Sequence, residues 1–309
     1  MVRYTGFIRL VYGKTKNMEA KQPKKSHQLT ELLNLIQKEI PLHSVYAIGI
    51  QTEKQTRKAY LKPKNKTVAK KASYTLLVIG HKPLKKGLGD LMDDLYGKMG
   101  QRCKVYIIYY TLSNVKRAMD IGDNFLSRTI HKTPCLYREN DKLIKVYGST
   151  PFYHKSVYED IQRTWESRME RAGYLLNILD GIEPKENALS RLSTMHHALE
   201  QVCMGLLYLF WEFRPQHYAL PYLLHLCGHF TDLPRIVFPT ETYGLHRMYY
   251  MLSNAHHIIR FKNRNEFTEV DADKAYHRCE QFYSAARELG DRHLEHLKEL
   301  HYKQKTVQA

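Results

Sequence analysis

Paired cysteines are missing from this sequence. It has five cysteines among 309 residues, and no two of them are spaced as Cys-x-x-Cys. An odd and scattered set excludes a disulfide framework and a zinc site of regular spacing. Cys103, Cys135, Cys203, Cys227 and Cys279 are therefore expected to be reduced thiols, most of them in a core.

Long apolar runs are missing as well. A helix that spans a membrane needs about 20 predominantly apolar residues, and the best candidate, Cys203 to Phe213, is about half that length. The first 25 residues are basic and never reach a sustained apolar stretch that ends in small residues, so we expect no secretory signal. The sequence therefore predicts a cytoplasmic protein without a membrane partner.

The short motifs of several enzyme classes are also absent. The sequence has no Gly-x-Ser-x-Gly, no Gly-x4-Gly-Lys-Ser/Thr and no Gly-x-Gly-x-x-Gly, which argues against serine hydrolases, P-loop NTPases and dinucleotide-binding enzymes. Acidic residues are scarce in one region, because Glu53 is the only one between Pro41 and Gly89. Chemistry through bound metal ions needs several carboxylates close together. We therefore expect no catalytic metal there.

Charge divides the chain into two unlike halves. Residues 1 to 150 contain 29 Lys and Arg against 11 Asp and Glu, a net charge of +18, whereas the rest has 19 against 20. Histidine is distributed the other way, with 13 of 17 in the second half. The contrast predicts two domains, and the basic half predicts a polyanionic partner, either nucleic acid or an acidic protein. Charge that serves solubility alone is the alternative.

The first half alternates between helical and strand patterns. Residues 1–25 form a basic extension to which we assign no function, and residues 26–150 form an α/β domain. A helix is expected from Ser26 until Pro41 ends it. The remaining predicted elements are strands at 45–50, 74–79 and 105–111, helices at 85–99, 113–121 and 124–130, and an edge hairpin from 135–137 and 143–146.

The stretch from Gln51 to Ser73 is the most basic part of the chain. It contains one acidic residue, Glu53, and almost nothing to bury, so we expect an exposed loop or a basic hairpin. Its eight cationic residues are Lys54, Arg57, Lys58, Lys62, Lys64, Lys66, Lys70 and Lys71.

The second half, residues 151–309, shows only helical periodicity. Its five predicted helices cover 156–179, 187–213, 218–230, 242–261 and 272–302, and we find no strand candidate among them. This pattern predicts an antiparallel all-α bundle. The fold class is therefore α+β, with a small α/β domain followed by a helical bundle.

Three segments of the bundle carry a resemblance to a known family. The sequence reads MHHALEQVCMGLLYLFW from Met195, RPQHYALPYLLHLC from Arg214 and NAHHIIRFKNRNEF from Asn254. Together they resemble the bacterial HEPN bundle, over about residues 155 to 303. His217 resembles the histidine of the family's third helix, and Arg260 and Arg264 resemble the basic end of its fourth. The resemblance implies dimerisation, and a role in phage defence or mobile-element biology.

HEPN bundles often follow a minimal nucleotidyltransferase domain, and the first half resembles one in part. In that fold a first strand ends in Gly-Ser and an Asp-x-Asp pair begins the next. Here Gly49 is present, but Ile50 takes the place of serine and the next strand begins Ser73-Tyr74-Thr75. Asp90, Asp93 and Asp94 lie on the following helix, where a solvated helix start explains them. The resemblance implies a degenerate domain that has lost its transferase chemistry.

Other catalytic and metal-binding interpretations find little support. Adjacent histidines such as His196-His197 and His256-His257 point about 100 degrees apart on a helix, and no further ligand completes a set. HEPN nucleases carry an Arg-x4-6-His motif late in the bundle. Arg191 and His196 fit that spacing, but they lie early in the second helix and about 140 degrees apart. We therefore predict no catalytic residue, no metal site and no cofactor.

Our leading hypothesis is a non-catalytic protein that binds a nucleotide or nucleic acid and forms a homodimer or higher oligomer through its bundle. The eight cations of residues 51–73 would contact phosphates, Gly49 would lie beside them, and Tyr60 would stack on a base. An active divergent nucleotidyltransferase or HEPN ribonuclease is one alternative, and an interaction protein that docks an acidic partner is another. The large side chains offered for dimerisation are Phe210, Trp211, Phe213, Tyr222, Tyr249 and Tyr250.

Overall fold

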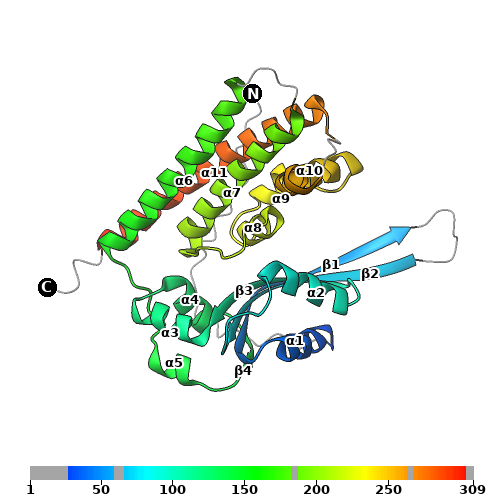
Figure 1. Cartoon of the computed structure of the whole chain (residues 1–309). Coiled ribbons are helices and arrows are strands. Elements are labelled where there is room, and N and C mark those ends of the chain that lie inside the picture. The colour runs from blue at the N-terminus through cyan, green and yellow to red at the C-terminus, as the bar shows by residue number, and fades with distance from the viewer. Residues whose placement is uncertain (1–26, 59–65, 182–186, 263–266, 304–309) are drawn as a thin grey trace.

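A computed structural model describes residues 27–58, 66–181, 187–262 and 267–303 of the chain, and it describes their side chains except at residues 52–58, 66–71, 180 and 303. Its first half is built on a four-stranded sheet and its second half is helical throughout the described residues (Figure 1). The predicted α+β class is therefore confirmed. The likeness of the second half to a HEPN bundle stays a prediction.

The sheet has the strand order β3-β2-β1-β4. Strand β1 (Leu42–Lys58) runs antiparallel to β2 (Lys66–Gly80) and to the short β4 (Cys135–Arg138), while β3 (Cys103–Thr111) runs parallel to β2. The central parts of β2 and β3 are apolar runs such as Leu76 to Ile79, all of them buried. Buried strands of this kind need cover on both faces, which the helices supply.

Among the described residues of the first half, five helices accompany the sheet, and we call this part of the chain, residues 27–58 and 66–146, the sheet domain. The five helices are α1 (His27–Glu39), α2 (Leu88–Lys98), α3 (Leu112–Asp120), α4 (Asn124–Lys132) and α5 (Lys142–Val146). Helix α1 buries Leu29, Leu32, Leu33 and Ile36, the apolar positions whose spacing predicted it. The predicted strand at 143–146 is wrong, because these residues form α5. A short apolar run fits a strand or a helix equally well, and only Leu143 is buried here.

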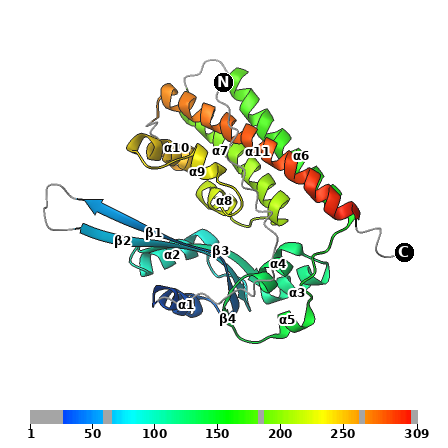
Figure 2. The same ribbon diagram turned by 180° about the vertical axis from the view of Figure 1, so that it is seen from behind.

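The basic stretch forms a hairpin, one of the two structures expected for it. Strands β1 and β2 pair continuously from Leu42↔Gly80 to Lys58↔Lys66, so both extend well beyond the predicted buried segments. A register shift separates Ala47 from Gly49. Pairing of β2 with β3 ends at Ala72, and beyond Thr52 and Ala72 the two strands project past the rest of the sheet, as both views show (Figures 1 and 2). We call the part from residue 51 to residue 73 the basic hairpin.

The described residues of the second half form six helices, in the order α6 (Lys155–Gly181), α7 (Ala188–Trp211), α8 (Leu220–Cys227), α9 (Leu233–Val237), α10 (Tyr243–Phe261) and α11 (Glu269–Lys303). Helix α7 buries residues around most of its circumference, as a central helix must. The short α9 has no counterpart among the predicted helices. None of the described helices combines the length and apolar character that a membrane span requires.

The aromatic side chains offered for dimerisation lie mostly inside the chain. Phe213 and Tyr222 are buried, and Phe210 stacks on Phe230 with ring centroids 4.6 Å apart. Trp211 stacks on Phe125 of the sheet domain at 5.8 Å. Tyr249 is partly buried against the core, which leaves Tyr250 as the exposed member of the set. Dimerisation stays a prediction, and these six residues supply little free surface for it.

Candidate functional site

The bundle meets the sheet at Thr75, a buried residue of β2. Its Oγ1 lies 2.7 Å from Nε2 of His225 on α8 and 2.9 Å from Nε2 of His229, which follows that helix. The two histidines are four positions apart, so the helical turn at the end of α8 places both rings on the same side. Thr75 belongs to the strand segment Ser73-Tyr74-Thr75, which was compared above with the carboxylate-bearing strand of nucleotidyltransferases. Two imidazoles of the bundle occupy this position.

The Thr75 hydroxyl determines how the two imidazoles share protons. A hydroxyl has one proton to donate. It can therefore donate to the bare Nε2 of one neutral ring and accept from the Nε2–H of the other neutral ring. Burial lowers the pKa of both histidines, that of His225 to about 3, with His229 and Lys104 adding smaller effects. Both rings are therefore neutral near pH 7. A neutral pair is suited to holding two domains together and poorly suited to binding an anion.

Neighbouring side chains fix the same contact. The ring of His225 stacks on Tyr106 of β3, with centroids 3.4 Å apart and planes inclined by 8°. A β-carbon built on Gly49 would overlap the ring of His229, so the glycine permits this close approach. Tyr222 of α8 donates a hydrogen bond to the carbonyl of Ile107, 3.0 Å away. The sequence hypothesis placed Gly49 beside a nucleotide, and in the structure it lies beneath an imidazole.

His217 makes a further contact between the domains. It lies before α8, which begins at Leu220, and its ring approaches Gly89 at the start of α2. Burial lowers the pKa of His217, although the nearby Asp93 and Asp90 act in the opposite direction. Asp94 forms an ion pair with Lys86. Of the three acidic residues of α2, Asp90 and Asp93 thus lie near His217, and Asp94 pairs with Lys86, which precedes the helix.

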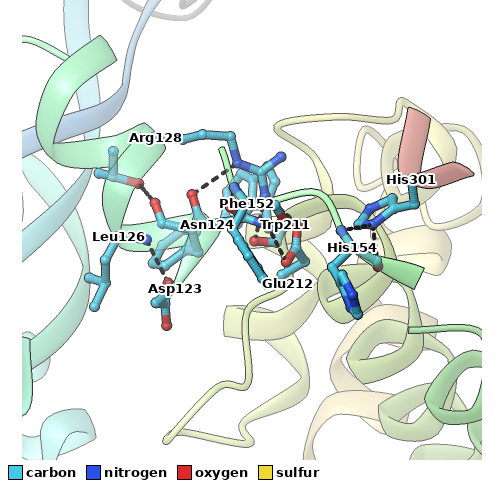
Figure 3. Close-up of polar contacts among 11 residues, drawn as sticks. Asp123, Asn124, Leu126, Arg128, Phe152, His154, Trp211, Glu212 and His301 are labelled. Atoms are coloured by element: carbon cyan, nitrogen blue, oxygen red, sulfur yellow. Dashed lines mark hydrogen bonds and ion pairs between the residues drawn. The ribbon is translucent and has the colours of Figure 1, made fainter. Parts of the chain in front are cut away.

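A second contact between the domains lies at the end of α7 (Figure 3). Glu212 has a left-handed backbone conformation, with φ of 58°, and its carboxylate accepts hydrogen bonds from Asn124 Nδ2 at 2.8 Å and Arg128 Nη2 at 3.4 Å. Arg128 Nη2 also donates to the Trp211 carbonyl at 2.9 Å. Asn124 in turn bonds both the N–H and the carbonyl of Phe152. Burial raises the pKa of Glu212 despite the arginine.

The cationic residues predicted to bind phosphate lie mainly in the paired strands. Lys54, Arg57 and Lys58 belong to β1, and Lys66, Lys70 and Lys71 belong to β2. The register sets Lys54 opposite Lys70 and Lys58 opposite Lys66. Tyr60, Lys62, Lys64 and Arg264 lie outside the described residues. Arg260 is exposed in the last turn of α10.

Arg191 and His196, which fit the nuclease spacing, do not face each other in an open site. Both are buried, and Arg191 pairs with Asp273 at 2.8 Å. His196 bonds the Leu252 carbonyl at 2.7 Å and Glu200 at 3.0 Å. The hydrogen bonds to His196 and His197 help to lower the pKa of Glu200 to about 2. Within the described residues, no group of three or more His, Cys, Asp or Glu side chains is placed to hold a metal ion.

Sequence reasoning missed the residues that join the two domains. His225 and His229 were not singled out, although their four-residue spacing was visible, and Thr75 was considered only as a missing carboxylate. Glu212 carried no signal, because a left-handed residue is usually glycine or asparagine. The partners of these side chains lie far away in sequence, so no local pattern could identify them.

Comparisons with known proteins give a weak structural likeness. No protein-family model matches the chain, and no curated protein is similar to it in sequence. Among solved structures, it is similar to a nucleotidyltransferase-like protein from Exiguobacterium sibiricum 255-15, with 12% identity over 82% of this chain and 72% of that chain. The TM-score is 0.28, which is too low to assign a fold or a function.

Proposed function

We propose that this protein is a non-catalytic nucleic-acid-binding protein whose basic hairpin contacts the phosphate backbone. The observation that carries the proposal is the register of β1 and β2, which sets lysine opposite lysine at two positions. Like charges at directly opposed positions destabilise an antiparallel pair. A phosphate backbone bound along the hairpin would neutralise them and release counterions.

Two further features support this choice. The half that carries the hairpin has a net charge of +18, whereas the rest of the chain has 19 basic against 20 acidic residues. The hairpin also projects past the rest of the sheet, on the side of the molecule where α10 lies, so a long polyanion could approach it from solvent (Figure 2). The sheet face at Thr75, in contrast, is covered by His225 and His229. That cover supports the non-catalytic part of the proposal.

Fluorescence anisotropy with the full chain tests the proposal. Labelled single strands and duplexes of about 20 nucleotides are titrated at several salt concentrations with the wild type and with a variant carrying Lys54→Glu, Lys58→Glu, Lys66→Glu and Lys70→Glu. Each lost phosphate contact removes about 0.7 to 0.9 from the slope of log K against log salt. Loss of four contacts should lower the slope by roughly 3.

A matched control separates a site from general charge. Lys116, Lys132, Lys142 and Lys145 are exposed on α3, α4 and α5, and their substitution by Glu changes the net charge by the same amount. This control should keep most of the wild-type affinity. Equal losses in both variants would contradict a hairpin site. Binding that survives in both, with retention of an acidic protein after nuclease treatment, would favour the interaction-protein alternative.

The non-catalytic part has its own test. The wild type is incubated with magnesium, a labelled nucleotide and RNA, and we expect no transfer to RNA or to the protein itself. Magnesium-dependent incorporation that disappears on substitution of Asp90, Asp93 or Asp94 would contradict the proposal.

A further inference from the structure

Helix α10 carries a row of exposed rings along one side. Tyr243, Tyr250 and Phe261 are 81%, 42% and 71% exposed, and His246 and His257 are also exposed. At about 100° per residue these positions fall within a narrow arc of the helix. We call this side of the helix the α10 outer face. It is defined by Tyr243, His246, Tyr250, Asn254, His257 and Phe261.

The opposite side of the same helix accounts for its place in the bundle. Met251, Leu252, Ala255 and Ile258 are buried. Asn254 donates to the Tyr250 carbonyl at 2.9 Å, so it keeps its amide on its own helix. The packing of α10 is therefore complete without the outer face, and the exposed rings are not needed for it.

Charge around this face favours a negatively charged ligand. The sequence has no acidic residue from 242 to 262, whereas this stretch contains Arg247, Arg260 and Lys262. Arg247 is engaged with Asp271 at 3.1 Å, but Arg260 is exposed in the last turn. The helix is thus free of carboxylates in a domain that otherwise has as many acidic as basic residues.

We propose that the α10 outer face binds unpaired bases of a single-stranded nucleic acid by stacking on Tyr243, Tyr250 and Phe261. The inference rests on the proposed function, since it names the class of nucleic acid that the protein prefers. Aromatic side chains stack on any base whose face is free, and a duplex offers no free faces along its length. The rings lie roughly 10 and 16 Å apart along the helix axis, so each can take a separate base.

The position of α10 agrees with this assignment. Both views show it on the side of the bundle toward which the basic hairpin projects (Figures 1 and 2). One nucleic-acid strand could therefore contact both the lysines of the basic hairpin and the rings of α10. A second copy of the chain fits the face less well, because a stable dimer buries about 800 Å² per partner and this face is one row wide with polar residues between the rings.

The experiment compares single strand and duplex with two sets of ring substitutions. The test variant carries Tyr243→Ala, Tyr250→Ala and Phe261→Ala. The control variant carries Tyr174→Ala, since Tyr174 is 67% exposed on α6 of the same bundle. Anisotropy gives the Kd of each protein for an oligo-dT of about 20 nucleotides and for a duplex of equal length. Circular dichroism and light scattering report the fold and the oligomeric state.

We expect the test variant to bind the single strand at least tenfold more weakly, while its duplex affinity changes less than twofold and the Tyr174→Ala control matches the wild type. Tyr250→Phe, which keeps the ring, should retain the wild-type affinity. Equal single-strand binding by a folded test variant overturns the inference, and the proposed function stands if the hairpin variant still loses both ligands. Conversion of an oligomer to a monomer with unchanged binding also overturns it, because the face would then be a contact between copies.

Discussion

The same two strands, β1 and β2, serve two opposite environments. Around Gly49 and Thr75 they lie under the bundle, where the polar partners are the neutral rings of His225 and His229. Beyond Thr52 and Ala72 they project past β3, and this part of the two strands carries six of the eight cationic residues. Burial explains the difference, because a charge is costly to remove from water and a neutral imidazole is much less so. The part of the two strands under the bundle thus contributes to stability, and the projecting part carries the positive charge.

The largest effect should come from filling the space between Gly49 and His229. We expect Gly49→Ala to lower the free energy of unfolding by about 2 kcal/mol, because the new methyl group overlaps a ring that is held by Thr75. Urea denaturation measures this change. Gly97→Ala on α2 is the matched control, since nothing lies near its added methyl group, and it should stabilise the helix slightly. A neutral Gly49→Ala would mean that the two domains do not pack as described.

The next effect depends on pH. The folded state lowers the pKa of His225 to about 3, so the unfolded chain binds a proton more readily and stability falls as pH drops below about 6.5. Near pH 5 the contribution lost should be about 1 to 2 kcal/mol. In His225→Gln the urea midpoint should depend less steeply on pH between 7 and 4 than in the wild type. Identical slopes for the two proteins would show that His225 is not the group that titrates.

The smallest effect is expected in the projecting half. Lys54→Glu introduces an opposite charge across from Lys70, outside the core. Its free energy of unfolding should change by less than about 0.5 kcal/mol, in the stabilising direction at low salt. A loss of several kcal/mol would mean that the basic hairpin contributes to the core, and the contrast between the two halves would fail.

Much of the fold could be predicted from local pattern. Apolar spacing identified α1, α2, α7 and α11, and the buried parts of β1, β2 and β3, because burial on one face repeats along each element. The length of the hairpin could not be predicted, since lysine-rich strands bury little and carry no apolar alternation. The strand predicted at residues 143–146 was wrong for a related reason, because four residues are too few to show whether apolar positions repeat as in a strand or as in a helix.

The contact between the domains was beyond reach of the sequence. Thr75 and His225 lie 150 residues apart, and no local sequence pattern around either residue indicates that the two are in contact. The large aromatic residues of α7 and α8 were predicted to contact a second copy of the chain, but most of them pack within the chain, against the sheet or the core. A sequence shows that a side chain needs a partner without showing which partner it finds.

Glu212 has a consequence for the cooperativity of folding. A left-handed residue other than glycine costs about 1 kcal/mol or more. Its N–H bonds the Tyr208 carbonyl of its own helix, whereas its carboxylate is held by Asn124 and Arg128 of α4. The hydrogen bonds from α4 help to offset this cost and are lost when the helical half separates from the sheet. We therefore expect the two halves to unfold in one cooperative transition.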